Sequence, residues 1–225
     1  NNGVLPAGPY LRVDVERANL VVKDGDGGEL GTLRGDFAFE QSGGVTKVGM
    51  NNVTVSVEVS GSAGSLEQGK GAMLVTGNGV AGSLEGKLKS NFRGVAANAT
   101  LVLHFNNTGS VVNEELLVGG ESIRVIFSDS ENVFSASLLG GSVNIGDVVT
   151  IEGDITFTSQ GDYNVFAGDK MTLFVGKGPL NKDGERNPDA KGLLVSEATI
   201  GLVKKDGKYA LSAEGQVSVG GIRGL

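Results

Sequence analysis

The residues best suited to chemistry in this sequence are carboxylates in two glycine-containing turns. They are Asp24, Asp26 and Glu29 in the first turn, and Asp183, Glu185 and Asp189 in the second. Calcium takes about six to eight oxygen ligands, which alternating carboxylates and nearby backbone carbonyls can supply. Neither turn completes the spacing of an EF-hand loop, so a solvated turn is the alternative. We therefore predict calcium as the candidate metal of both turns and no other cofactor.

A catalytic site is not predicted. The chain has one histidine, His104, and no cysteine. Leu101, Leu103 and Phe105 occupy the alternate positions around it, so we expect the imidazole on the polar face of a strand. A Ser-His-Asp triad would need this histidine, yet no G-x-S-x-G elbow occurs. Without cysteine, thiol catalysis and zinc-thiolate sites are excluded.

Two short motifs have structural alternatives. Residues 77–82 match G-x-G-x-x-G, but a dinucleotide site needs a helix directly afterwards, and residues 83–87 are typical of a strand. Residues 34–36 read Arg-Gly-Asp, which resembles an integrin-binding tripeptide. They lie inside a predicted strand rather than on a loop tip, and residues 152–154 at the corresponding position read Glu-Gly-Asp.

The composition narrows the classes of partner that the chain is expected to bind. The net charge of −7 disfavours nucleic acid and anionic membrane. No apolar run approaches the roughly 20 residues that span a bilayer, and the first residues do not have the pattern of a signal peptide. Aromatic residues make up only 5% of the chain, with no tryptophan, which lowers the case for a carbohydrate platform. Glycine is abundant at 38 residues, without the period of collagen.

A long internal repeat organises these residues. Residues 35–39 and 153–157 share the pattern Gly-Asp-apolar-x-Phe, 118 residues apart, and the segments that follow also match. Matches continue at related offsets, including residues 70–73 with 191–194, and the offsets change at turns. We predict a first module at residues 1–132 and a second, incomplete module at 133–225, and expect them to belong to a longer tandem array.

The predicted fold is all-β. Apolar and polar residues alternate in short segments, for example Val53, Val55 and Val57 after an expected break or bulge at Asn51–Asn52. We expect loops at residues 42–44, 61–71 and 204–208 and an inward-facing strand at residues 121–127. Short connections between consecutive strands favour tandem antiparallel β-meander modules, rolled into sandwiches or a barrel. A parallel β-solenoid is the alternative.

A resemblance to modules of very large bacterial surface or secreted proteins, some of which have LEPR-XLL or haemolysin-type calcium-binding regions, is carried by residues 7–13, 33–41, 192–195, 198–203 and 209–211. The resemblance implies an extracellular or cell-surface, adhesin-like structural protein and supplies no catalytic residue. The Gly-Gly-x-Gly-x-Asp repeats of haemolysin-type calcium rolls are absent from this chain.

We therefore expect a structural or adhesive repeat segment that acts as a spacer, filament or stalk. Its expected partners are neighbouring repeat modules of the same protein, with self-assembly through module packing or strand addition. Two alternatives stay open. One is a polysaccharide- or cell-surface-binding module, which an aromatic cleft at Tyr163 or Tyr209 would favour. The other is a β-helix-type polysaccharide-degrading enzyme, which a solenoid with clustered charged residues would favour.

Overall fold

The computed structural model describes residues 10–23, 28–59, 62–92, 95–145, 148–178, 180–182, 185–206 and 208–220, and it contains strands and no helix in these ranges. The strands of the main sheet are β1 Tyr10–Lys23, β2 Glu29–Ser42, β3 Val45–Val59, β4 Ser62–Thr76, β5 Gly79–Phe92, β6 Val95–Asn106, β9 Val133–Ile145, β10 Val149–Gln160, β11 Tyr163–Lys177, β14 Lys191–Lys205 and β15 Lys208–Gly220. Two small hairpins are formed by β7 Val112–Val118 with β8 Glu121–Phe127, and by β12 Asn181–Lys182 with β13 Glu185–Arg186.

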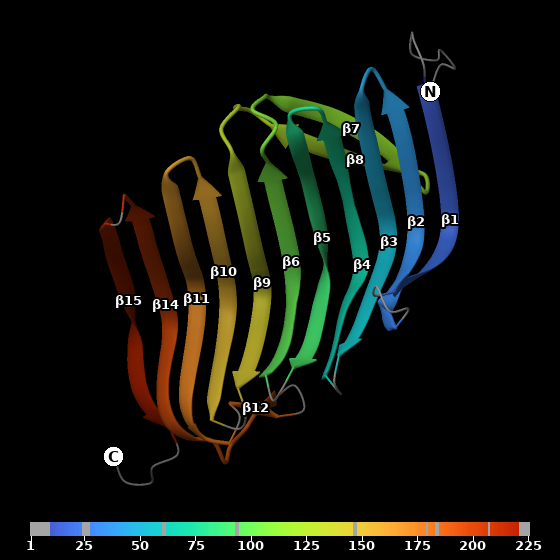
Figure 1. Cartoon of the computed structure of the whole chain (residues 1–225). Coiled ribbons are helices and arrows are strands. Elements are labelled where there is room, and N and C mark those ends of the chain that lie inside the picture. Colours follow the sequence, from blue (N-terminus) through green and yellow to red (C-terminus); the bar gives the residue numbers. More distant parts are fainter. Residues whose placement is uncertain are drawn as a thin grey trace.

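The main sheet is an 11-stranded antiparallel meander in which the strands lie in chain order (Figure 1). Strand β6 pairs directly with β9, so the sheet continues across the predicted boundary between residues 132 and 133. The predicted antiparallel meander is confirmed. The sheet is open and does not close into a barrel. All pairings between the described strands are antiparallel, which is not the arrangement of a parallel solenoid.

A line of β-bulges crosses this sheet near the middle of its strands. In β1, β3, β4, β9, β11 and β14, two residues lie opposite one residue of the neighbouring strand. Each bulge contains a residue with a positive φ angle; these residues are Arg17, Asn52, Gln68, Gly140, Lys170 and Glu197. An extra residue at a bulge bends the strand and reverses the alternation of the side chains that follow.

The bulges keep apolar side chains on one face of the sheet. In β3, Val48 and Met50 precede the bulge, whereas Val53 and Val55 follow it, so the apolar positions change from even to odd numbers at Asn52. Without the extra residue, the second half of the strand would direct its apolar side chains to the opposite face. The predicted break at Asn51–Asn52 is therefore confirmed as a bulge.

The bulges recur in the same order in both halves of the sheet. Strands β1, β3 and β4 correspond to β9, β11 and β14. The corresponding bulge residues are Arg17 with Gly140, Asn52 with Lys170, and Gln68 with Glu197. The separation in the last pair is 129 residues, so the sequence-based match of residues 70–73 with 191–194 is wrong. The predicted loop at residues 61–71 is also wrong, because residues 62–71 belong to β4.

One face of the sheet carries a separate hairpin. Strands β7 and β8 leave the main sheet and pack over β2 to β5 (Figure 1). The buried residues of this core come from both layers and are Ala38, Ala72, Leu74, Ala81, Val112, Leu116, Val118, Ile123 and Val125. Ile123 and Val125 were expected to face inward, and both are buried. The alanines of the sheet give the larger side chains of the hairpin room to approach the backbone.

A charged network holds the hairpin to the first three strands. The Nζ atom of Lys47 lies 3.4 Å from Glu40 Oε1 and 2.7 Å from Glu114 Oε2 of β7. Arg12 reaches Glu40 at 3.3 Å and donates a 2.6 Å hydrogen bond to the carbonyl oxygen of Leu117. The side chains of Lys47 and Glu40 are each only 18% exposed, so this network is more shielded than a typical surface ion pair.

The same face is covered a second time near the opposite ends of β10 and β11. The segment that contains β12 and β13 brings Leu180 to Thr150 of β10, and both residues are buried. The backbone N–H of Leu180 donates to Thr150 Oγ1 at 3.3 Å, and that hydroxyl donates to Asn144 Oδ1 at 2.7 Å. Phe174 of β11 also points to this face and is 2% exposed.

We predict that Gly49→Ala destabilises the chain by about 1–3 kcal/mol, because a Cβ atom on Gly49 would overlap Val118 and crowd Leu116 of the hairpin. Urea unfolding measures the change. The matched control is Gly201→Ala on the same face of β14, where nothing lies within 4 Å of the new Cβ atom. Equal stability of the two variants would contradict the observed packing of the β7–β8 hairpin against Gly49.

The Lys47 network predicts a pH-dependent contribution to stability. Burial alone would lower the pKa of Lys47, but the hydrogen bond to Glu114 and the charges of Glu114 and Glu40 raise it. A raised pKa stabilises the fold fully below the pKa of the unfolded lysine, about 10.4, and the contribution is lost as pH rises through the folded pKa. We expect Lys47→Met to cost about 1–3 kcal/mol near pH 7.

The cost of Lys47→Met should shrink as the pH rises above the pKa of an unfolded lysine and through the raised pKa of folded Lys47. Lys89→Met is the control, because the Lys89 side chain is 55% exposed and pairs with Glu67 at the surface. A difference between wild type and Lys47→Met that stays constant with pH in urea unfolding would rule out this network.

Candidate interaction surface

The residues predicted to bind calcium are not gathered in the described part of the chain. Asp24, Asp26 and Asp183 lie outside the described residues. Glu29 begins β2, while Glu185 lies in β13 and Asp189 in the turn after it, and all three are exposed. No group of three or more Asp, Glu or His side chains in the described ranges is arranged to hold a metal. Calcium binding at the two turns remains a prediction.

His104 lies on the polar face of β6, as its alternation predicts, and is exposed. Its neighbours in register are Ser83 of β5 and Ser135 of β9. These positions supply a hydroxyl on each side but no carboxylate to orient the imidazole, as a triad requires. Residues 77–82 form the tip of the β4–β5 hairpin and the start of β5, so no helix follows the G-x-G-x-x-G match.

The repeated Gly-Asp pair stabilises the bulges. Asp36 Oδ1 accepts a 2.8 Å hydrogen bond from the backbone N–H of Arg17, which is the bulge residue of β1. In the second half, Asp154 Oδ1 accepts a 2.6 Å hydrogen bond from the N–H of Gly140 in β9. Each aspartate therefore satisfies a backbone donor that the bulge removes from the ladder.

The glycine of the pair is required by the neighbouring bulge. Gly35 and Gly153 have φ angles of 150° and 127°. A Cβ atom on Gly35 would lie 2.8 Å from the Val53 Cα, and one on Gly153 would lie 2.9 Å from the Met171 Cα. The Gly-Asp pair thus accommodates one bulge and caps another. This role explains the Arg-Gly-Asp tripeptide without a receptor.

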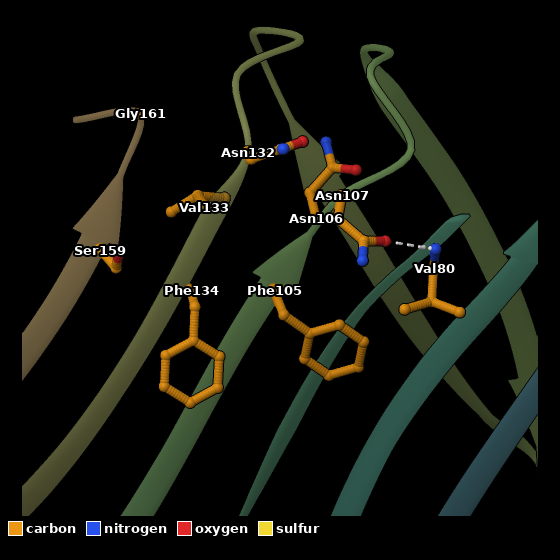
Figure 2. A pocket seen from close by; sticks show the side chains of 9 residues that line it. All are labelled: Val80, Phe105, Asn106, Asn107, Asn132, Val133, Phe134, Ser159 and Gly161. Carbon is orange, nitrogen blue, oxygen red and sulfur yellow. Dashed lines mark hydrogen bonds between the residues drawn. The ribbon is translucent and has the colours of Figure 1, made fainter. Parts of the chain in front are cut away.

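A small cavity lies at the tips of β5, β6, β9 and β10. It has a volume of about 240 Å³, and Phe105 and Phe134 form one side of it (Figure 2). The Oδ1 atom of Asn107 already accepts a 2.6 Å hydrogen bond from the N–H of Val80. Asn106 is 1% exposed, and its Oδ1 atom accepts hydrogen bonds from the backbone N–H and the hydroxyl of Thr108. The lining contains no titratable side chain, so it supplies no acid or base.

A second cavity, of about 340 Å³, is lined by Tyr163, Glu131 and neighbouring residues of β10 and β11. Tyr163 was the candidate aromatic platform for a sugar. The Nζ atom of Lys205 lies 4.1 Å from the centroid of its ring and donates a 2.7 Å hydrogen bond to the tyrosine hydroxyl. Lys205 therefore occupies the hydroxyl end of the Tyr163 ring through a hydrogen bond and a cation–π contact.

The largest unexplained surface is the face of the main sheet opposite the β7–β8 hairpin, here called the apolar face. Alternation places on it large apolar side chains from all eleven strands. Those that are at least 37% exposed are Leu11, Val13, Val15, Phe39, Val75, Phe134, Phe157, Val175, Leu193, Leu211, Val217 and Val219. Val53 and Met171 of this face are buried among their neighbours at the bulges.

The apolar face is also nearly free of charge. Between the strand tips, Lys204 of β14 is the charged side chain that alternation directs to this face in the described strands. The opposite, polar face carries the charged network of Lys47 and exposed ion pairs such as Lys89 with Glu67. The strand-by-strand apolar pattern was visible in the sequence, but its continuity over eleven strands required the bulge positions.

No family model, curated protein or solved structure matches this chain. No helix able to cross a bilayer occurs in the described ranges. The fold and the two faces of the sheet are therefore the basis for a functional proposal.

We predict that Asp154→Ala costs about 1–2 kcal/mol of stability, because the Gly140 N–H at the bulge loses its acceptor. Urea unfolding and the hydrogen-exchange rate of the Gly140 amide measure the effect. Asp154→Asn retains an oxygen acceptor and should recover most of the loss. A Gly140 amide that exchanges no faster in Asp154→Ala than in wild type would be inconsistent with this hydrogen bond.

Proposed function

We propose that this chain is a structural repeat segment that extends a continuous β-sheet as a spacer, filament or stalk. The observation that carries the proposal is the recurrence of the bulge line in β1–β4 and β9–β14, within one sheet that passes without a break from β6 to β9. A repeat that continues the sheet of its neighbour adds length, because each unit supplies the pairing edge for the next.

The two edges of the sheet are the proposed joints. Among the described strands, β1 and β15 each pair with one neighbour, so one side of each backbone presents donors and acceptors that no described strand pairs with. Such an edge accepts an added strand through main-chain hydrogen bonds. Neighbouring repeat modules of the same protein are the proposed partners, and the division at residues 132 and 133 marks repeats of sequence within one continuous sheet. The extracellular bacterial setting and the adhesive role rest on the resemblance described above.

The edge proposal predicts open-ended association that depends on β15. Of two consecutive residues in an edge strand, one directs its N–H outward, so either Ala210→Pro or Leu211→Pro removes an outward donor. We expect wild-type chains to form linear oligomers longer than dimers, as seen by sedimentation and electron microscopy. One of the two proline variants should lose this growth while circular dichroism shows an unchanged content of strands.

Ala210→Ser is the control, because it keeps the backbone N–H and should associate as wild type does. If wild-type chains never exceed a dimer, or if both proline variants grow as wild type does while folded, joining through this edge is wrong. Growth beyond a dimer distinguishes edge joining from an association of two chains through one face of the sheet, which would close at two copies.

A further inference from the structure

We propose that the apolar face is the interface with the same face of a second copy of this chain, so that two open sheets form a closed sandwich. This pairing is separate from the edge joints described above. It uses the surface that lies opposite the β7–β8 hairpin, whereas the edge joints use the backbone of β1 and β15.

The size of the face is the first argument. Strands of 12 to 15 residues and eleven neighbours give a surface roughly 40 Å by 50 Å, on the order of 2,000 Å², at about 3.3 Å per residue and 4.8 Å per strand. The largest apolar patch of a typical monomer is about 300–600 Å². A stable interface takes about 800 Å² from each partner. The face thus exceeds what a monomer leaves exposed and is large enough for a stable dimer.

The second argument compares how far the chain itself covers each of the two faces of the sheet. Part of the polar face is covered by segments of this same chain: β7 and β8 cover Ala38 and Leu74, and the β12–β13 segment brings Leu180 onto Thr150. The exposed apolar residues left on that face, such as Leu139 and Val203, are few and scattered. The described chain provides no such cover for Phe39, Phe134 or Phe157, which are 42%, 44% and 39% exposed. A second copy supplies an apolar surface of matching extent.

The chemistry of the face favours another sheet over a lipid surface. Proteins that lie on phospholipid combine apolar residues with basic residues around them. On this face of the described strands, alternation places Lys204 between the strand tips and Lys177 and Lys191 at the tips, so its basic residues are confined to β11 and β14 rather than surrounding the face. Large side chains lie beside glycines, as Phe105 does beside Gly82 and Leu66 beside Gly86. These side chains fill the space above the glycines and keep the face apolar there, and two sheets with apolar faces pack about 10 Å apart. The central part of such an interface is typically depleted in charge.

The test compares Phe39→Glu combined with Phe134→Glu against Ile126→Glu. Ile126 is 59% exposed on β8, so it is a matched apolar residue away from the proposed interface. To isolate this pairing, all chains carry the same edge-blocking proline in β15, at position 210 or 211. Leu211 belongs to the apolar face, but it lies on the edge strand, so any effect of that proline on the face is small and common to all the chains compared. Sedimentation equilibrium should give a dimer for the parent chain and for Ile126→Glu. The double variant should raise the dissociation constant at least 100-fold.

A second measurement remains decisive if the double variant folds poorly. Because the chain has no cysteine, Phe134→Cys or Ile126→Cys places a single spin label. We expect labels at position 134 to approach one another across the two facing sheets, whereas labels at 126 lie on the outer surfaces. Parent chains that remain monomeric, double variants that dimerise as tightly as Ile126→Glu, or chains that instead bind phosphatidylcholine vesicles as monomers would overturn the proposal.

Discussion

Side chains of a strand alternate between two faces, and a strand of 14 or 15 residues must keep that alternation in phase with its neighbours over its full length. In this protein the phase is set by single extra residues. At the bulges of β3 and β11, Asn52 and Lys170 shift the apolar positions by one, so both halves of each strand direct them to the same face. The rest of the structure depends on this constraint, because the alternative would place valine and leucine side chains among the charges of the polar face.

The repeated Gly-Asp pair is the local chemistry that makes the bulges tolerable. Gly153 lets the backbone of β11 approach, and Asp154 satisfies the Gly140 amide on the other side. The Arg-Gly-Asp sequence at residues 34–36 resembles a receptor-binding motif, but its Gly-Asp pair has the same structural role at the bulges as the pair at residues 153–154. The polar face is completed by the β7–β8 hairpin, which buries its core side chains there, while the apolar face remains available for association. A long sheet with repeated geometry, open edges and one apolar face is suited to assembly.

Much of this architecture could be predicted from the sequence. The alternation around Val53 and the paired asparagines predicted both a strand and its bulge, and the glycines at residues 43 and 44 predicted the tip between β2 and β3. Local patterns could not show that Ile123 and Val125 face a hairpin core rather than the main sheet, because burial looks the same in either layer. The glycines of residues 61–71 resembled a loop. In the structure, Gly69 and Gly71 lie in β4, where larger side chains would contact the backbone of β3 or β5.

The central claim is that each bulge residue acts by adding one residue to its strand, whichever side chain it carries. Deletion of Lys170 tests this claim most directly, and Lys170→Gly is its length-preserving control. The side chain of Lys170 is 85% exposed, and its backbone has a φ angle of 50°. We expect Lys170→Gly to unfold in urea at or above the wild-type midpoint, because glycine relieves the backbone. The deletion should prevent cooperative folding, because Met171, Leu173 and Val175 would turn to the polar face. A deletion variant that unfolds at the wild-type midpoint would contradict the claim.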